Sequence, residues 1–280
     1  MNIDRFNHVT RIAILPNHFR CMQYIFLLLL AIFSHLVVVD SHAETSVASK
    51  VDSLSSKEAT TIISEAVHYW RGVSSVTLAE MRIHHKSYDR TYKLKSWTRG
   101  DDFSLVKFIE PARDAGTATL HRGEAIWSYS PKSAKVVRIP SSMMFRSWMG
   151  SDFSYRDLAR ADDIIRYYDH NLVGVKAENG KKVYHIRSIP KEDSPVVWGR
   201  EDFLVREDKI VLLHEFYDQE GKLVKRMEAL DIGELGGRLY PLLMRMMNVE
   251  TGEWTELRHL EAEFDLELGD NLFRVEGLGK

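Results

Sequence analysis

The residues of this chain that could do chemistry form small groups. His259, Glu261 and Glu263 alternate along a predicted strand, so they would share one face, and imidazole and carboxylate groups are common metal ligands. The alternative is that these carboxylates lie on a solvated strand face, and we expect no metal site. His84 and His85 are adjacent, so on a strand they point to opposite faces and cannot bind one ion together.

A second group could be interpreted as an acid–base set; it consists of Ser151-Asp152 with Arg146, Arg156 and Arg160 nearby. These residue types are more typical of the polar groups of a loop. The sequence contains no G-x-S-x-G, no H-E-x-x-H, no glycine-rich phosphate loop and no C-x-x-C. We therefore expect no catalytic residue, no cofactor and no enzymatic activity.

The N-terminus has the pattern of a secretory signal peptide. Basic residues precede an apolar run of 18 residues, 22–39, and the small residues Ser41 and Ala43 suit a cut after Ala43. An uncleaved membrane anchor is the alternative, because the run is close to the length that crosses a bilayer. We predict that residues 1–43 are a cleaved signal peptide and that the mature chain is periplasmic.

Composition limits the partners of the mature chain. The only cysteine, Cys21, lies within the predicted signal peptide, so no disulfide is expected. The whole chain has 38 basic and 40 acidic residues, whereas a protein that binds nucleic acid needs a basic surface. We predict a flexible lead-in at 44–55 and a single domain at 56–280, long enough to bury a core.

The elements that must position any site are one helix followed by many strands. Apolar residues recur at helical spacing over 57–71, and Gly72 stops the pattern. Glycine, proline and asparagine turns then separate short runs with strand character. The predicted strands are 76–85, 90–98, 103–110, 117–121, 125–129, 135–139, 171–177, 183–189, 203–206, 210–217, 223–232, 239–249 and 255–266.

This pattern predicts an antiparallel sheet of roughly ten or more strands that curls into a barrel or sandwich, with the helix packed on it. In 239–249 both faces are apolar, whereas a half-solvated sheet alternates apolar with polar residues. Either both faces pack on a core, or one of them lines a cavity.

The segment 141–163 has no strand period and is unusually apolar for a connection. It is rich in methionine, a side chain that adapts to variable apolar partners. The segment is either a lid that contacts a ligand or a plug that packs permanently on the core.

Several stretches resemble a known family. They are GTATL at 116–120, IWSYSP at 126–131, VRIPSS at 137–142, MGSDFSYRDL at 149–158 and DQEGKLV at 218–224. In this order they are similar to the LolA-like outer-membrane lipoprotein-sorting proteins, in particular to the branch that shares a treponemal LolA-like domain.

The resemblance implies a mainly β fold, a curved and incompletely closed antiparallel barrel covered by one or more helices, as in LolA and LolB. It also implies a periplasmic carrier that shields lipid or lipoprotein acyl chains between an inner-membrane transporter and an outer-membrane acceptor. The alternative is an adaptor or sensor of the same fold that binds a protein, such as an exporter of the RND or MMPL type. Neither alternative involves nucleic acid.

For a carrier, the expected ligand contacts lie at the cavity mouth and on the wall behind it. The mouth residues are Met143, Met144, Phe145, Trp148, Met149 and Phe153, and the wall residues are Trp127 and Tyr129.

Overall fold

The computed structural model describes residues 41–159 and 162–279, so the predicted signal peptide, 1–43, lies outside them except for its last three residues. Contacts divide the chain into two units, residues 1–48 and 49–280, and every strand belongs to the second. Of the first unit, only the beginning of one helix is described.

Thirteen strands form one antiparallel sheet, which confirms the predicted fold class. Hairpin turns fall where the sequence places them, as at Asn179-Gly180 between β7 and β8, where both residues adopt a positive φ. The strands are β1 Ser74–His85, β2 Tyr88–Arg99, β3 Phe103–Glu110, β4 Ala118–Arg122, β5 Ala125–Ser130, β6 Lys135–Arg138, β7 Tyr168–Glu178, β8 Lys181–Pro190, β9 Arg200–Arg206, β10 Val211–Tyr217, β11 Leu223–Leu235, β12 Arg238–Asn248 and β13 Trp254–Phe264.

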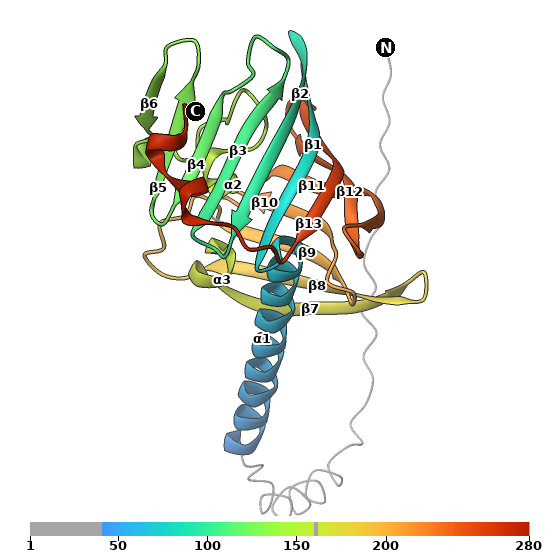
Figure 1. Ribbon diagram of the computed structural model, residues 1–280. Coiled ribbons are helices and arrows are strands. Elements are labelled where there is room, and N and C mark those ends of the chain that lie inside the picture. Colours follow the sequence, from blue (N-terminus) through green and yellow to red (C-terminus); the bar gives the residue numbers. More distant parts are fainter. Residues whose placement is uncertain (1–40, 160–161, 280) are drawn as a thin grey trace, which may run out of the picture. The chain divides into compact units, whose positions relative to one another are not determined.

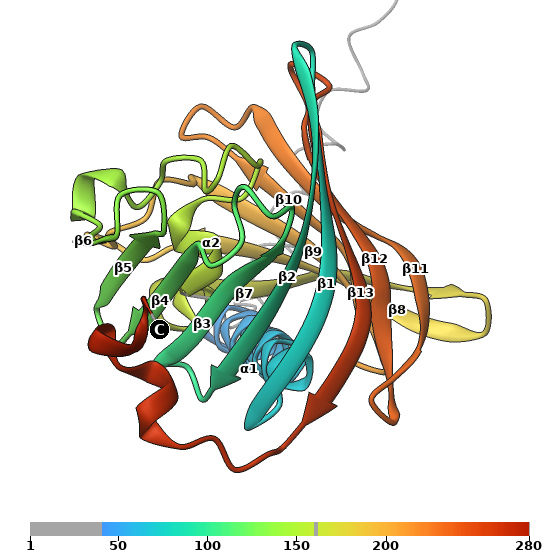
Figure 2. The ribbon, with the colours of Figure 1, turned by 45° about the horizontal axis from the view of Figure 1, so that its top comes forward.

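The first and the last strand meet in the middle of the sheet. Strands β1 to β6 run in order to one side and β7 to β13 to the other, and β1 pairs with β13 (Figure 1). The free edges are therefore β6 and β7, which do not pair with each other. The sheet is strongly curved but open, as expected for an incompletely closed barrel (Figure 2).

Helix α1 (Ser41–Arg71) begins earlier than predicted, so residues 44–55, expected to be a flexible lead-in, are helical. No proline or glycine interrupts this stretch, and nothing in it stops a helix before Gly72. Gly72 ends the helix at a φ of +63° that disfavours other residues. The predicted part of the helix packs on the concave side of β7 to β9 through Ala59, Ile63 and Ala66 (Figure 2).

The concave face of the sheet and part of its convex face are covered. The convex face of β3 to β5 lies under the C-terminal segment, which contains the short 3₁₀ helices η2 (Asp270–Phe273) and η3 (Val275–Gly277). Leu105 and Leu120 pack there against Phe273. The concave face is covered by α1 and by the segment between β6 and β7.

The segment 139–167 joins the two free edges by running through the concave side. It contains the 3₁₀ helix η1 (Ser141–Met143) and the short helices α2 (Tyr155–Ala159) and α3 (Asp163–Tyr167). Ser154 and Asp157 cap α2 reciprocally: each backbone N–H donates to the other side chain, at 2.7 and 3.1 Å. We call residues 139–167 the interior segment.

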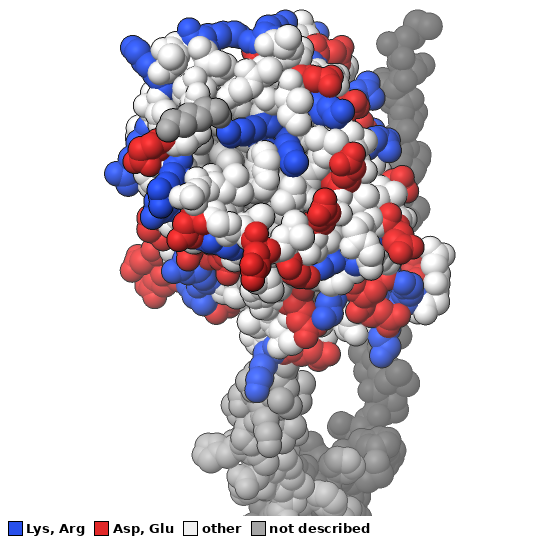
Figure 3. Space-filling model, viewed as in Figure 1, with Lys and Arg blue, Asp and Glu red and all other residues white. Residues whose placement is uncertain are grey.

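The described surface has mixed charge. Figure 3 shows lysine and arginine interspersed with aspartate and glutamate over one face, with uncharged residues between them. Among the helices that the structure describes, none has the length and apolar character needed to cross a membrane.

Candidate functional site

The concave side of the sheet encloses a cavity of 630 Å³ between the strands, α1 and the interior segment. Residues of β1 to β3, β7 and β9 to β13 line it, because strand alternation turns one face of a strand toward the cavity. Its apolar lining includes Leu94, Val106, Phe203, Met227, Met244 and Met246. Three of these are methionines on neighbouring strands, and their unbranched side chains adapt to irregular apolar contacts.

A buried polar group lies in the cavity wall formed by β7, β9 and β10. His214 Nε2 is 2.6 Å from Glu201 Oε2, and the His214 ring stacks on Phe203 with centroids 3.9 Å apart. Burial and the neighbouring Glu201 carboxylate raise the pKa of Tyr168, so this hydroxyl stays protonated. These groups satisfy one another, which allows polar atoms to lie in an otherwise apolar wall.

The interior segment is fixed across the cavity by buried polar contacts. Asp152 N–H donates to Thr255 Oγ1 of β13 at 2.9 Å, and that hydroxyl donates back to Asp152 Oδ2 at 2.7 Å. Lys225 of β11 donates to the Asp152 carbonyl at 2.6 Å. Burial raises the pKa of Asp152, because desolvation outweighs these contacts. Asp152 therefore anchors the segment, in keeping with the expected polar role in a loop.

A second buried contact holds α2 to α3. Arg156 pairs with Asp163, and its guanidinium lies over the ring of Phe145, 5.2 Å from the centroid. Phe145, Arg156 and Asp163 all line the cavity. The contact therefore positions Phe145 at the place where the interior segment meets the cavity.

Of the eight residues predicted to contact a ligand, the structure brings Phe145 and Phe153 to the cavity. Met143 is exposed on the interior segment, and Met144 is buried against Ile126. Trp148 and Met149 pack in the core formed by β1 to β3. These four side chains do not line the cavity.

Trp127 and Tyr129 lie on β5, and no residue of this strand lines the cavity. They pair with Leu120 and Ala118 of β4 and pack beneath the C-terminal segment on the convex side. Alternation along β5 shows that the two residues share a face, but it does not show which face is concave.

Many of the cavity-lining residues that the sequence did not single out lie on β9 to β13, and others lie on α1 and on β1 to β3. Tyr240, Met244 and Met246 share the apolar face noted in 239–249, and this face lines the cavity. The alternation of these apolar residues along the strand was the sequence feature that could have identified them. Phe203 and Phe216 gave no comparable signal, because a short apolar strand looks the same whether it lines a cavity or fills a core.

The arrangement considered for a metal is absent. A β-bulge opposite Leu78 and Ala79 falls between His259 and Glu261, so His259 points inward and Glu261 and Glu263 are exposed. Residues 41–159 and 162–279 contain no cluster of three possible metal-ligating side chains.

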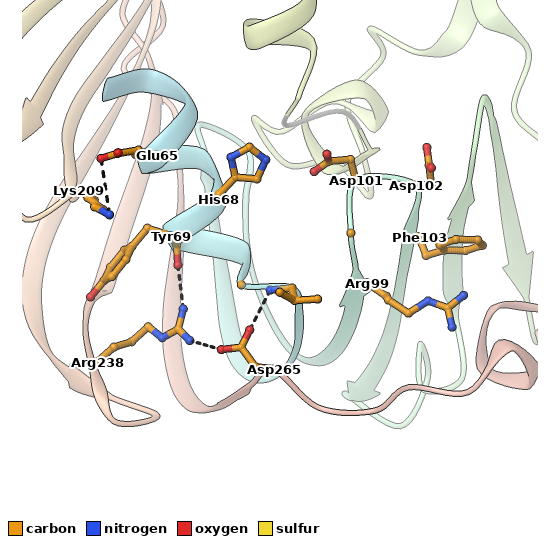
Figure 4. A pocket seen from close by; sticks show the side chains of 13 residues that line it. Glu65, His68, Tyr69, Arg99, Asp101, Asp102, Phe103, Lys209, Arg238 and Asp265 are labelled. Atoms are coloured by element: carbon orange, nitrogen blue, oxygen red, sulfur yellow. Dashed lines mark hydrogen bonds and ion pairs between the residues drawn. The ribbon is translucent and has the colours of Figure 1, made fainter. Parts of the chain in front are cut away.

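A second, more open hollow lies beside the C-terminal end of α1 (Figure 4). Several of its charged groups are paired: Arg238 donates to the Tyr69 carbonyl at 3.1 Å and to Asp265 at 2.9 Å, and Lys209 lies 3.6 Å from Glu65. These contacts hold α1 to the end of β13 and account for the polar character of the hollow.

Comparisons with known proteins agree with this architecture. A family model described as "-like: Uncharacterized protein" matches residues 100–280. No curated protein matches the chain in sequence. In structure, the chain is similar to a DUF1329 family protein from Desulfovibrio piger, at 27% identity and a TM-score of 0.72, over 80% of this chain and 99% of that one.

Two further solved structures are similar. A Vibrio parahaemolyticus domain, provisionally described as an outer membrane lipoprotein-sorting protein domain, has 25% identity and a TM-score of 0.71 over 80% of this chain and 100% of that one. A LolA superfamily protein from Nitrosomonas europaea shares the fold at 20% identity and a TM-score of 0.64, over 77% and 97% of the two chains. Each of these neighbours is matched over nearly its whole length.

Proposed function

Because the chain belongs to the LolA-like family of outer-membrane lipoprotein-sorting domains, we propose that it carries acyl chains of lipids or lipoproteins through the periplasm inside its cavity. The observation that supports this most is the 630 Å³ cavity, which lies on the concave side of the sheet and is lined largely by apolar side chains. Pockets that bind small molecules have roughly 300–1,000 Å³ and a mostly apolar lining.

The physical need for such a carrier follows from the hydrophobic effect. Each CH₂ group that leaves water contributes about 0.8 kcal/mol, so one sixteen-carbon chain exposes on the order of 10 kcal/mol. An apolar cavity removes this barrier to diffusion across an aqueous gap. Release requires an acceptor that binds the cargo better or a movement of the covering segment. The proposed partners are accordingly a membrane transporter that loads the cavity and an acceptor that empties it.

The direct test is the content of the purified protein. We expect organic extracts of the natively purified, exported protein to contain acyl lipid in near-stoichiometric amount, measured by mass spectrometry against a mock purification. The intact mass of the same preparation should correspond to a chain that begins at Glu44. Extracts that match the mock purification, together with no uptake of added lipid, would favour the adaptor that binds a protein.

Phe145 offers a residue-level test at the cavity. Its side chain lines the cavity yet the residue is 41% exposed, so Phe145→Ser should weaken binding of a fluorescent fatty-acid probe by about 5- to 10-fold while the protein stays folded. Met143 is the matched control, because it is 43% exposed on the same segment and does not line the cavity. Equal affinities of Phe145→Ser, Met143→Ser and the unmodified protein would remove Phe145 from the site.

A further inference from the structure

Arg71, the last residue of α1, lies at one end of the cavity and is buried without an ionic partner. The residue is only 9% exposed and lines the cavity. Its Nη2 donates to the Gly100 carbonyl at 3.0 Å, while its Nε has no hydrogen-bond partner among the described residues. No carboxylate of the described chain lies within ion-pair distance of its guanidinium.

A buried cation without an ionic partner is costly, because desolvation is not offset by a nearby opposite charge. Burial accordingly lowers the pKa of Arg71 from its ordinary value, and the more distant Asp101 and Asp162 offset this only in part. Lys225 of β11 also lines the cavity and donates to the Asp152 carbonyl rather than to a carboxylate, whereas two other charged groups of the cavity are paired. Arg156 is paired with Asp163, and Glu201 is hydrogen-bonded by His214.

Hydroxyl groups surround the same end of the cavity. Ser104, Thr98 and Ser75 are cross-strand neighbours on β3, β2 and β1, and all three face the cavity. The Ser75 and Thr98 hydroxyls lie 2.6 Å apart. Thr98 is two residues before Gly100, whose carbonyl accepts from Arg71, so this row lies at the strand ends nearest the guanidinium.

Farther along the strands the lining becomes apolar. Thr77 and Ser96 still form a hydroxyl pair at 2.5 Å, but Ala79 and Leu94 follow on the same faces. At this end the cavity therefore has a buried guanidinium without an ionic partner beside a row of hydroxyls, and apolar side chains such as Leu94 and Val106 line the part that follows.

We propose that this end binds the anionic head group of a single-chain amphiphile, a carboxylate or a phosphate, whose acyl chain fills the apolar part. The proposal rests on the proposed carrier function and specifies its cargo. A guanidinium with adjacent hydroxyl donors suits oxyanions, because the hydrogen bonds are charge-assisted. A sixteen-carbon chain occupies roughly 480 Å³, if each carbon group takes ~30 Å³ as a water molecule does. The 630 Å³ cavity thus holds one chain and its head group.

A structural role at the helix end is the competing explanation for Arg71, since cations favour helix C-termini. The observed hydrogen bond, however, goes to Gly100 in the turn after β2 and not to the last carbonyls of α1. Ligand binding separates the two explanations, because a purely structural arginine does not discriminate between head groups.

The experiment measures the affinities of hexadecanoate, hexadecyl phosphate and hexadecanol for the delipidated full chain, for Arg71→Met and for Arg245→Met. Arg245 is the matched control, because it lies on the convex face of β12 with Glu256 as its partner. We expect the unmodified protein and Arg245→Met to bind at least one anion about tenfold or more tighter than the alcohol. Arg71→Met should retain alcohol binding and lose the preference. The tighter anion identifies the head group.

Equal affinity of the unmodified protein for the anions and the alcohol would overturn the inference and leave the carrier function standing. An unchanged preference in Arg71→Met would also overturn it. If none of the three compounds binds, the carrier function itself fails, and the inference falls with it. Should Arg71→Met not fold, the comparison of head groups on the unmodified protein decides the matter alone.

Discussion

Replacing Trp148 with alanine is expected to lower the free energy of unfolding by about 3–5 kcal/mol, the usual cost of truncating a large buried aromatic side chain. Trp148 is 2% exposed, and its ring lies 5.3 Å from that of Phe108. Its indole N–H donates to Thr119 Oγ1 at 3.0 Å, so truncation also leaves a buried hydroxyl without this donor. Denaturant unfolding followed by circular dichroism measures the change.

Met143→Ala is the control for Trp148, since Met143 lies on the same interior segment but is exposed. Its free energy of unfolding should stay within about 0.5 kcal/mol of that of the unmodified protein. A Trp148→Ala protein that unfolds at the normal denaturant concentration but no longer binds an acyl probe would instead make Trp148 a cavity-mouth residue, as the sequence pattern predicts.

Acidification from pH 7.5 to 4.5 is expected to destabilise the protein by about 2–3 kcal/mol through His259 alone. His259 is buried beside Tyr240, and its Nδ1 lies 2.9 Å from the Pro241 carbonyl. Burial lowers the pKa of His259 to about 4. The unfolded chain binds a proton near pH 6.5 and the folded chain does not, so stability is lost as the pH falls from about 6.5 toward 4.

The measurement is the difference in unfolding free energy between pH 7.5 and 4.5. His259→Phe should make this difference smaller by about 2–3 kcal/mol, whatever its effect at neutral pH. Tyr240→Phe is the matched control, since it alters the same cluster, and burial raises the pKa of Tyr240, which keeps it from titrating in this range. Burial also lowers the pKa of His170. Through this residue, the His259→Phe protein should keep part of its acid sensitivity. An unchanged pH difference in His259→Phe would contradict the assignment.

Most of the sheet could be predicted, because its order is local. Each strand except β1 and β13 pairs only with its sequence neighbours, and turns such as Asn179-Gly180 fix where the strands end. The pairing of β1 with β13 and the position of the open edges were not readable, since no local pattern marks which distant strands meet.

The site was predicted less well than the fold, for two physical reasons. Alternation assigned Trp127 and Tyr129 to a common face, but the C-terminal segment covers the convex face with apolar residues, so hydrophobicity could not distinguish the two faces. In the interior segment the apolar residues recur with no regular spacing. Phe145 and Trp148 therefore looked equivalent in sequence, although one lines the cavity and the other is core.

The pairing of β1 with β13 also has a consequence for the order in which the chain can fold. Strands β1 to β6 can form hairpin by hairpin as soon as they are made, but one edge of β1 stays without its partner until β13, near the end of the chain, is available. Contacts between such distant segments close slowly, and an unpaired strand edge is a template for association with other chains. A protein that crosses a membrane N-terminus first would be exposed to this risk until its last strand has emerged. For the proposed exported protein, folding would therefore be completed only after translocation.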